Sequence, residues 1–140
     1  MVLSYPIFVA EIRHVSGKRE KSKEVLKMPF IHVRTARPIP DAARQTMTRT
    51  LGRDIRLLGK SEEWLMLQFE GNCALAFRGQ EDSDAAFVYV GLLGRAAGAQ
   101  TERLTAALCA MLEKEMSLPP DHVYVQYVES TSWGWNGSNF

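Results

Sequence analysis

The sequence lacks any apolar run long enough to cross a bilayer, which needs about 18–20 residues. Its opening apolar stretch, "MVLSYPIFVAEI", is interrupted by Pro6 and Glu11, and positive charge follows it instead of preceding it. A secretory signal has the opposite order. We therefore predict a cytoplasmic protein without a membrane partner, and we leave open secretion without a leader.

Cysteine is scarce, and so is net charge. The two cysteines, Cys73 and Cys109, form no CxxC motif and have no histidine nearby, which favours reduced thiols over a disulfide framework. His14 falls near the N-terminus, while His32 and His122 fall on predicted strands without ligand partners, so we expect no metal site. A formal net charge of +1 gives no electrostatic reason to bind nucleic acid.

What is present fits a single soluble domain, with 140 residues of which 46% are apolar and 24% charged. The charge is uneven along the chain. Residues 1–28 carry six Lys or Arg against three Glu, whereas residues 29–140 carry eleven Lys or Arg against thirteen Asp or Glu. We therefore divide the sequence into an N-terminal extension, residues 1–28, and one domain, residues 29–140.

The domain consists of two successive strand–helix–strand patterns. Alternating or β-branched apolar residues predict strands at 29–35, 64–70, 85–93 and 122–128, with a short extra piece at 74–79. Apolar residues at helical spacing predict helices at 41–58 and 98–118, and the second of these stops before Pro119 and Pro120.

The two units resemble each other in detail. "PFIHV" matches "AFVYV" at an offset of 57, with Phe30 over Phe87 and Val33 over Val90. Two such units predict an α+β fold with a four-stranded mixed sheet and both helices on one face. The strands are apolar on both sides, so the uncovered face needs a partner and we expect an oligomer. The alternative is a coincidental repeat in a monomer.

Four stretches carry a resemblance to a known family: "MPFIHVRT", "LGK", "LPPDHVYVQYV" and "WGWNGSNF". In order and at this spacing, residues 29–140 resemble the macrophage migration inhibitory factor and D-dopachrome tautomerase branch of the tautomerase superfamily. The resemblance implies a βαβ-repeat fold, assembly as a homotrimer and no cofactor. It also implies a catalytic N-terminal proline, which would be Pro29 after removal of Met28.

Moving a proton between the carbon and oxygen of a keto acid needs a base that is neutral at physiological pH. A free α-amino group begins at a pKa of about 7.7–8.0, and burial or a nearby cation lowers it. Inside a chain, however, the Pro29 nitrogen is an amide without basicity. A translation start at Met28 resolves this conflict, and codons for Lys23-Glu24-Val25 can contain the bacterial ribosome-binding sequence AGGAGG. A disordered basic extension and a cleaved pro-segment are the alternatives.

The resemblance also assigns pocket residues around Pro29. Lys60 would bind the substrate carboxylate and lower the pKa of the base, although a lysine just after a helix is ordinarily solvated. Leu93 stands where the family has an isoleucine whose backbone lines the pocket. Tyr124, which could otherwise be a core or sheet-face aromatic, would come from the neighbouring subunit. Gln126 stands beside it where an asparagine is usual.

Tryptophans would make the pocket unusually aromatic. Trp135 matches a pocket tryptophan of the family, Trp133 replaces a smaller aliphatic residue, and Trp64 stands where a tyrosine is common. Phe140 would pack at the pocket floor or at a subunit contact. Such a pocket suits a small aromatic α-keto acid such as phenylpyruvate.

We therefore predict a phenylpyruvate- or dopachrome-type tautomerase. The alternative is a non-catalytic, cytokine-like member of the family that binds a protein receptor of unknown identity, with Pro29 blocked by the extension. The CxxC motif of macrophage migration inhibitory factor would fall at residues 86–89 and is absent, so no thiol oxidoreductase activity is expected.

Overall fold

The computed structural model describes residues 28–140. The predicted extension therefore lies outside the described residues, apart from Met28. Of the predicted elements, the strand at 29–35 appears with unchanged bounds as β1, Pro29–Thr35.

The centre of the molecule is a four-stranded mixed sheet, as predicted, and its strand order is β2-β1-β5-β6. Strand β2 spans Met66–Glu70, β5 spans Ala86–Leu93, and β6 spans Val123–Ser130. Strands β1 and β5 pair antiparallel in the middle, and each pairs in parallel with its own outer strand. This is the arrangement expected when two strand–helix–strand units join through their first strands.

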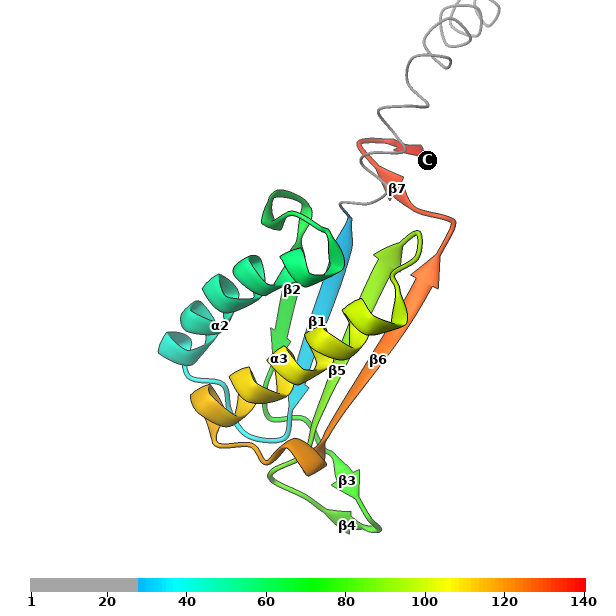
Figure 1. Ribbon diagram of the computed structural model, residues 1–140. Helices are drawn as coiled ribbons and strands as arrows, with labels where there is room; N and C mark the ends of the chain where they lie inside the picture. The colour runs from blue at the N-terminus through cyan, green and yellow to red at the C-terminus, as the bar shows by residue number, and fades with distance from the viewer. Residues whose placement is uncertain (1–27) are drawn as a thin grey trace, which may run out of the picture.

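Two helices cover one face of the sheet (Figure 1). Helix α2, Asp41–Asp54, continues into the 3-10 helix η1, Ile55–Leu58, and helix α3 spans Gly98–Met116. The helix predicted at 41–58 thus tightens in its last turn, and the prediction of two helices on one face is confirmed.

Alternation along the strands sends one set of side chains toward the helices. Ile31 and Val33 of β1 and Val88 and Val90 of β5 are fully buried. They pack in one core with the apolar faces of both helices, to which α2 contributes Met47 and Leu51 and α3 contributes Leu104, Leu108 and Leu112. The helices therefore attach to the sheet by apolar burial.

Within residues 28–140, no helix covers the opposite sheet face, and this face is less apolar than predicted. Three aromatic residues, Phe30, Phe87 and Tyr124, lie on this face. Polar residues that also face away from the core, such as His32 and Glu70, lie among them. The His32 Nε2 atom lies 2.9 Å from Glu70 Oε1. The prediction of strands apolar on both sides is wrong here, while the uncovered face itself is present (Figure 1).

Shorter elements complete the fold. The 3-10 helix η2, Glu62–Trp64, takes the first residue that was predicted for the second strand. The extra piece at 74–79 becomes a hairpin of β3, Ala76–Phe77, and β4, Gln80–Glu81. The 3-10 helix η3, Pro120–His122, leads into β6, and the tail folds into β7, Gly134–Trp135, and β8, Ser138–Asn139.

The helices between residues 28 and 140 have no membrane-spanning potential. None of them is both long enough and apolar enough to cross a bilayer.

The core packing predicts the cost of a cavity. Leu108 has no exposed surface, so Leu108→Ala should lower the free energy of unfolding by about 3 kcal/mol in urea denaturation. Arg103→Ala, at an exposed position of the same helix, is the matched control and should change it by less than about 0.5 kcal/mol. Equal losses in the two variants would contradict the assigned helix face.

Candidate functional site

A cavity of about 850 Å³ opens at the end of the sheet where β1 begins. Strand β1, the segment leading into β2 and the C-terminal tail each supply part of its wall. The lining residues are Met28, Pro29, Phe30, Glu63, Trp64, Leu65, Met66, Leu67, Trp133, Gly134 and Trp135. Four of the residues predicted for the pocket, Pro29, Trp64, Trp133 and Trp135, therefore meet in one cavity.

Lys60 is buried, with only 4% of its surface exposed. The turn at Gly59 accounts for this burial. Gly59 has a φ of 69°, in the left-handed region, and this conformation ends η1 and turns the chain inward. Burial lowers the pKa of the Lys60 ammonium from its ordinary value of 10.5. The interpretation of Lys60 as a solvated lysine after a helix end is therefore wrong.

The backbone of Leu93 connects Lys60 to the start of β1. Its carbonyl oxygen accepts a hydrogen bond from Lys60 Nζ at 3.3 Å, and its amide donates to the Met28 carbonyl at 3.2 Å. Pro29 itself pairs with Leu92 in the sheet. Lys60 and Leu93 are not among the residues that line the cavity in the 140-residue chain, but these hydrogen bonds connect them to Met28, which does line it.

Aromatic contacts organise the mouth of the cavity. The Trp64 and Trp135 rings meet edge to face, with centroids 4.9 Å apart and an interplanar angle of 80°. Phe140 also stacks on Trp135, with ring centroids 6.5 Å apart, and its amide donates to the Trp133 carbonyl at 3.0 Å. The tail thus places its aromatic residues beside η2, and Phe140 supports Trp135.

Tyr124 and Gln126 lie far from this cavity. Tyr124 pairs with Phe87, whereas Pro29 pairs with Leu92 of the same strand, five residues further along. At about 3.3 Å per residue, this separates the two positions by about 17 Å along the sheet. Tyr124 is 59% exposed on the face without helices. Within one subunit, the structure does not bring Tyr124 or Gln126 to Pro29.

Sequence reasoning missed the contribution of β2 and its approach. Met66 pairs with Phe30, which places it beside Pro29, and it is 67% exposed. Glu63 adds a carboxylate to the cavity wall. The predicted strand–helix–strand unit already implied this contribution, because parallel pairing of its two strands brings both of their first residues to the same end of the sheet.

The neighbours of His122 differ from those predicted. Its Nδ1 lies 2.6 Å from Asp82 Oδ2, and Asp82, Asp84 and His122 form the one group between residues 28 and 140 with atoms close enough to hold a metal. The prediction that His122 lacks ligand-type neighbours is wrong. These atoms are already engaged, however, because Asp84 pairs with Arg37 and its amide donates to Asp82. The group therefore fastens the base of the β3–β4 hairpin.

Both cysteines are free, as predicted. Burial is the main reason that the pKa of each thiol, Cys73 and Cys109, is raised. A raised pKa keeps a thiol protonated and unreactive at neutral pH. Neither residue is an activated nucleophile.

Comparison with known proteins gives one consistent result. The family model for macrophage migration inhibitory factor (MIF) matches residues 28–140. The macrophage migration inhibitory factor of Xenopus laevis is 27% identical over 118 residues, which cover 81% of this chain and 99% of that protein.

Solved structures agree. The crystal structure of Leishmania major MIF2 superimposes with a TM-score of 0.76 at 30% identity, covering 81% of this chain and 98% of that one. The homologue from Prochlorococcus marinus gives a TM-score of 0.70 at 25% identity, covering 79% and 98%. The chain belongs to the macrophage migration inhibitory factor family, within the tautomerase superfamily.

Proposed function

We propose that the chain beginning at Pro29 is a keto–enol tautomerase of small aromatic α-keto acids, with Pro29 as the general base. The observation that carries this proposal is the position of Pro29, which borders the tryptophan-lined cavity and pairs with Leu92, next to the Leu93 carbonyl that binds buried Lys60. We also propose that residues 1–28 are absent from the active protein, through a start at Met28 followed by removal of that methionine, or through cleavage.

The surroundings of Pro29 suit a base that works near neutral pH. A free α-amino group has a pKa of about 7.7–8.0. Pro29 is buried, and the Lys60 ammonium binds the carbonyl oxygen of Leu93, which follows Leu92, the strand partner of Pro29. Burial and a nearby positive charge both disfavour the protonated amine. The pKa of the free Pro29 amine should therefore fall below its ordinary value. A base so tuned takes the proton from the substrate carbon and returns it to the oxygen, or the reverse.

Lys60 and Leu93 would hold the acid end of the substrate. The Leu93 amide donates to Met28 in the 140-residue chain, so removal of Met28 leaves this N–H facing the site. The amide and the Lys60 ammonium are then two donors for one carboxylate. Charge-assisted hydrogen bonds of this kind also stabilise the enolate that develops during the reaction.

The substrate's aromatic ring would lie among the tryptophans. Trp64 and Trp135 contact each other and Phe140 stacks on Trp135, which gives the cavity an aromatic wall. An aryl ring gains both buried area and edge or stacking contacts in such a site. Phenylpyruvate combines this ring with the required α-keto acid.

A homotrimer would complete the site. Assembly as a trimer is typical of the family, and the sheet face without helices carries the exposed Tyr124. Along the sheet, Tyr124 lies about 17 Å and Gln126 about 10 Å from their own Pro29, so we expect both to approach the Pro29 of another subunit instead. We propose that they close each pocket from the neighbouring protomer.

A non-catalytic, cytokine-like role is the second candidate, and one observation favours it. In the 140-residue chain the Pro29 nitrogen is an amide, and the Leu93 amide is occupied by Met28. A protein that keeps residues 1–28 lacks both the base and one carboxylate donor. It would act through its surface.

Chain length tests the proposal directly. The chain beginning at Pro29 should convert enolphenylpyruvate to the keto form, whereas the 140-residue chain should be slower by at least about 100-fold, because it lacks the general base. Pro29→Gly in the short chain is the control, since it keeps a free amine but loses the ring, and its rate should lie between the two. Equal rates for the long and short chains would refute Pro29 as the base.

The Lys60→Met variant distinguishes a role of Lys60 in substrate binding from a role in the stability of the fold. In the short chain it should lower kcat/KM for phenylpyruvate by about 100-fold, because it removes a donor to the carboxylate and enolate. The melting temperature should not fall, since methionine fills similar space without a buried charge. An active Lys60→Met variant would exclude the proposed role.

The Lys60→Met variant also tests how the free energy of unfolding depends on pH. Because the folded pKa of Lys60 is lowered from 10.5, the unfolded chain binds more protons between the folded value and 10.5. The free energy of unfolding of the 140-residue wild type should therefore rise relative to that of Lys60→Met across this window, and the difference should be constant at lower pH. Urea denaturation at stepped pH measures it, and a wild-type free energy of unfolding that falls relative to that of Lys60→Met with rising pH would contradict the burial of the charge.

A further inference from the structure

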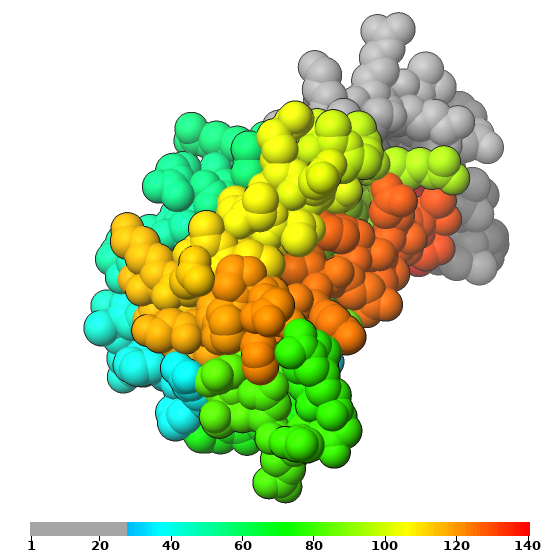
Figure 2. Space-filling view, turned by 60° about the horizontal axis from the view of Figure 1, so that its bottom comes forward, coloured from blue at the N-terminus to red at the C-terminus, as the bar shows by residue number. Residues whose placement is uncertain are grey.

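The β3–β4 hairpin projects from the end of the sheet opposite the start of β1 (Figure 1), beside the residues that lead into β6 (Figure 2). Its turn consists of Arg78 and Gly79, with φ values of 56° and 80°. Positive φ at both turn residues is the signature of a tight two-residue hairpin whose twist matches its strands. The tip therefore has a defined geometry.

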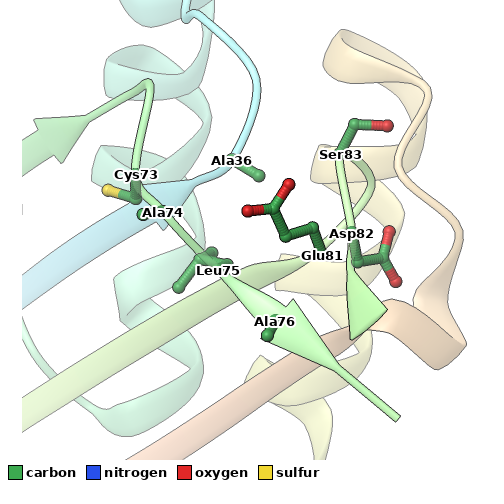
Figure 3. A pocket seen from close by; sticks show the side chains of 8 residues that line it. All are labelled: Ala36, Cys73, Ala74, Leu75, Ala76, Glu81, Asp82 and Ser83. Carbon is green, nitrogen blue, oxygen red and sulfur yellow. The ribbon is translucent and has the colours of Figure 1, made fainter. Parts of the chain in front are cut away.

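The hairpin is fastened at its base. Asp82 donates its amide to the Leu75 carbonyl at 3.1 Å, while its side chain binds His122. A cavity of about 360 Å³ remains between the hairpin arms and Ala36, with the Glu81 side chain directed across it (Figure 3). The contact with His122 ties the hairpin to η3, so the hairpin is positioned relative to the start of β6.

Phe77 makes the contact with β6. Its ring meets the Tyr124 ring edge to face, with centroids 5.5 Å apart and an interplanar angle of 86°. The same ring lies 5.5 Å from the His122 ring. Tyr124 is thus held from one side by an aromatic residue of the hairpin, while 59% of its surface remains exposed.

Arg78 adds a positive charge at this place. Its guanidinium lies 4.8 Å from the centre of the Phe77 ring. Its Nη2 is 3.6 Å from Asp121 Oδ2, in a pair whose side chains are 61% and 65% exposed. An ion pair this exposed contributes little, about 0–1 kcal/mol. Nη2 also donates a long, exposed hydrogen bond to the Asp121 carbonyl oxygen at 3.5 Å. Because both contacts are long and exposed, the guanidinium can turn to another anion at small cost.

We infer that the β3–β4 hairpin forms the outer wall of the neighbouring subunit's pocket and that Arg78 selects aromatic α-keto acids with a second anionic group on the ring. This inference rests on the proposed function, in which Tyr124 closes that pocket. Because Phe77 contacts Tyr124 and Arg78 contacts Phe77, both residues would lie at the same neighbouring pocket as Tyr124. Lys60 would hold the keto acid carboxylate at the inner end, and Arg78 would meet the far end of the ring. Phe77 is a positioning residue for Tyr124.

Two substrates and four proteins test the inference. Phenylpyruvate and 4-carboxyphenylpyruvate are compared in the chain beginning at Pro29, both by kcat/KM and by the Kd from quenching of tryptophan fluorescence. The wild type should prefer the 4-carboxy compound by about 10-fold, the size of one charge-assisted contact. Arg78→Ala should bring this ratio close to one. Asp121→Asn should raise it above the wild-type value, because the competing carboxylate is gone.

Arg103→Ala, which removes an exposed arginine on α3, is the matched control and should keep the wild-type ratio. The same ratio in Arg78→Ala and in the wild type would overturn the inference, and so would a fall in Asp121→Asn. Turnover of both compounds without a preference would leave the proposed function intact while overturning the inference. Absence of turnover with an Arg78-dependent ratio of Kd values would refute the proposed catalysis and support the role of Arg78.

Discussion

The backbone of Leu93 is the point on which the arrangement of the site depends. Its carbonyl oxygen holds the buried Lys60 ammonium, and its amide holds the chain just before Pro29. Both groups belong to β5, one of the two central strands, so the sheet fixes the cation and the proline relative to each other. A buried ammonium is tolerated only where acceptors satisfy it, and a strand-end carbonyl is a rigid acceptor. Sheet pairing thus becomes the source of the site's precision.

The pseudo-repeat explains why the residues proposed for the site lie at two different ends of the molecule. Strands β1 and β5 run antiparallel in the middle, and each brings a parallel partner. Equivalent positions of the two units therefore lie at opposite ends of the sheet. Pro29 begins β1 at one end, and Tyr124 lies near the start of β6 at the other. A molecule built this way needs a second copy to bring the two ends together.

Much of the fold was predictable because apolar periodicity reflects which face of an element is buried. Strand β1 and both helices follow such patterns, and the helical spacing of Leu104 and Leu108 correctly identifies the core face of α3. The places where prediction failed have other causes. Trp64 joins a 3-10 turn because Ser61 caps it by accepting from the Glu63 amide, a local hydrogen bond that apolar alternation does not reveal. Burial of Lys60 depends on the left-handed turn at Gly59, and the pairing of His122 with Asp82 joins residues 40 positions apart.

The hydrogen bond between Met28 and Leu93 has a consequence for how such a protein can be controlled. It is one backbone bond at the very start of a strand that is otherwise paired on both sides. Losing it costs about 0.5–1.5 kcal/mol, a small part of the stability of a domain. Its loss leaves the pairing of β1 with β2 and β5 in place, while a chain that begins at Pro29 has an amine where the 140-residue chain has an amide. Start-codon choice or a single proteolytic cut would then act as an irreversible switch that requires no conformational change.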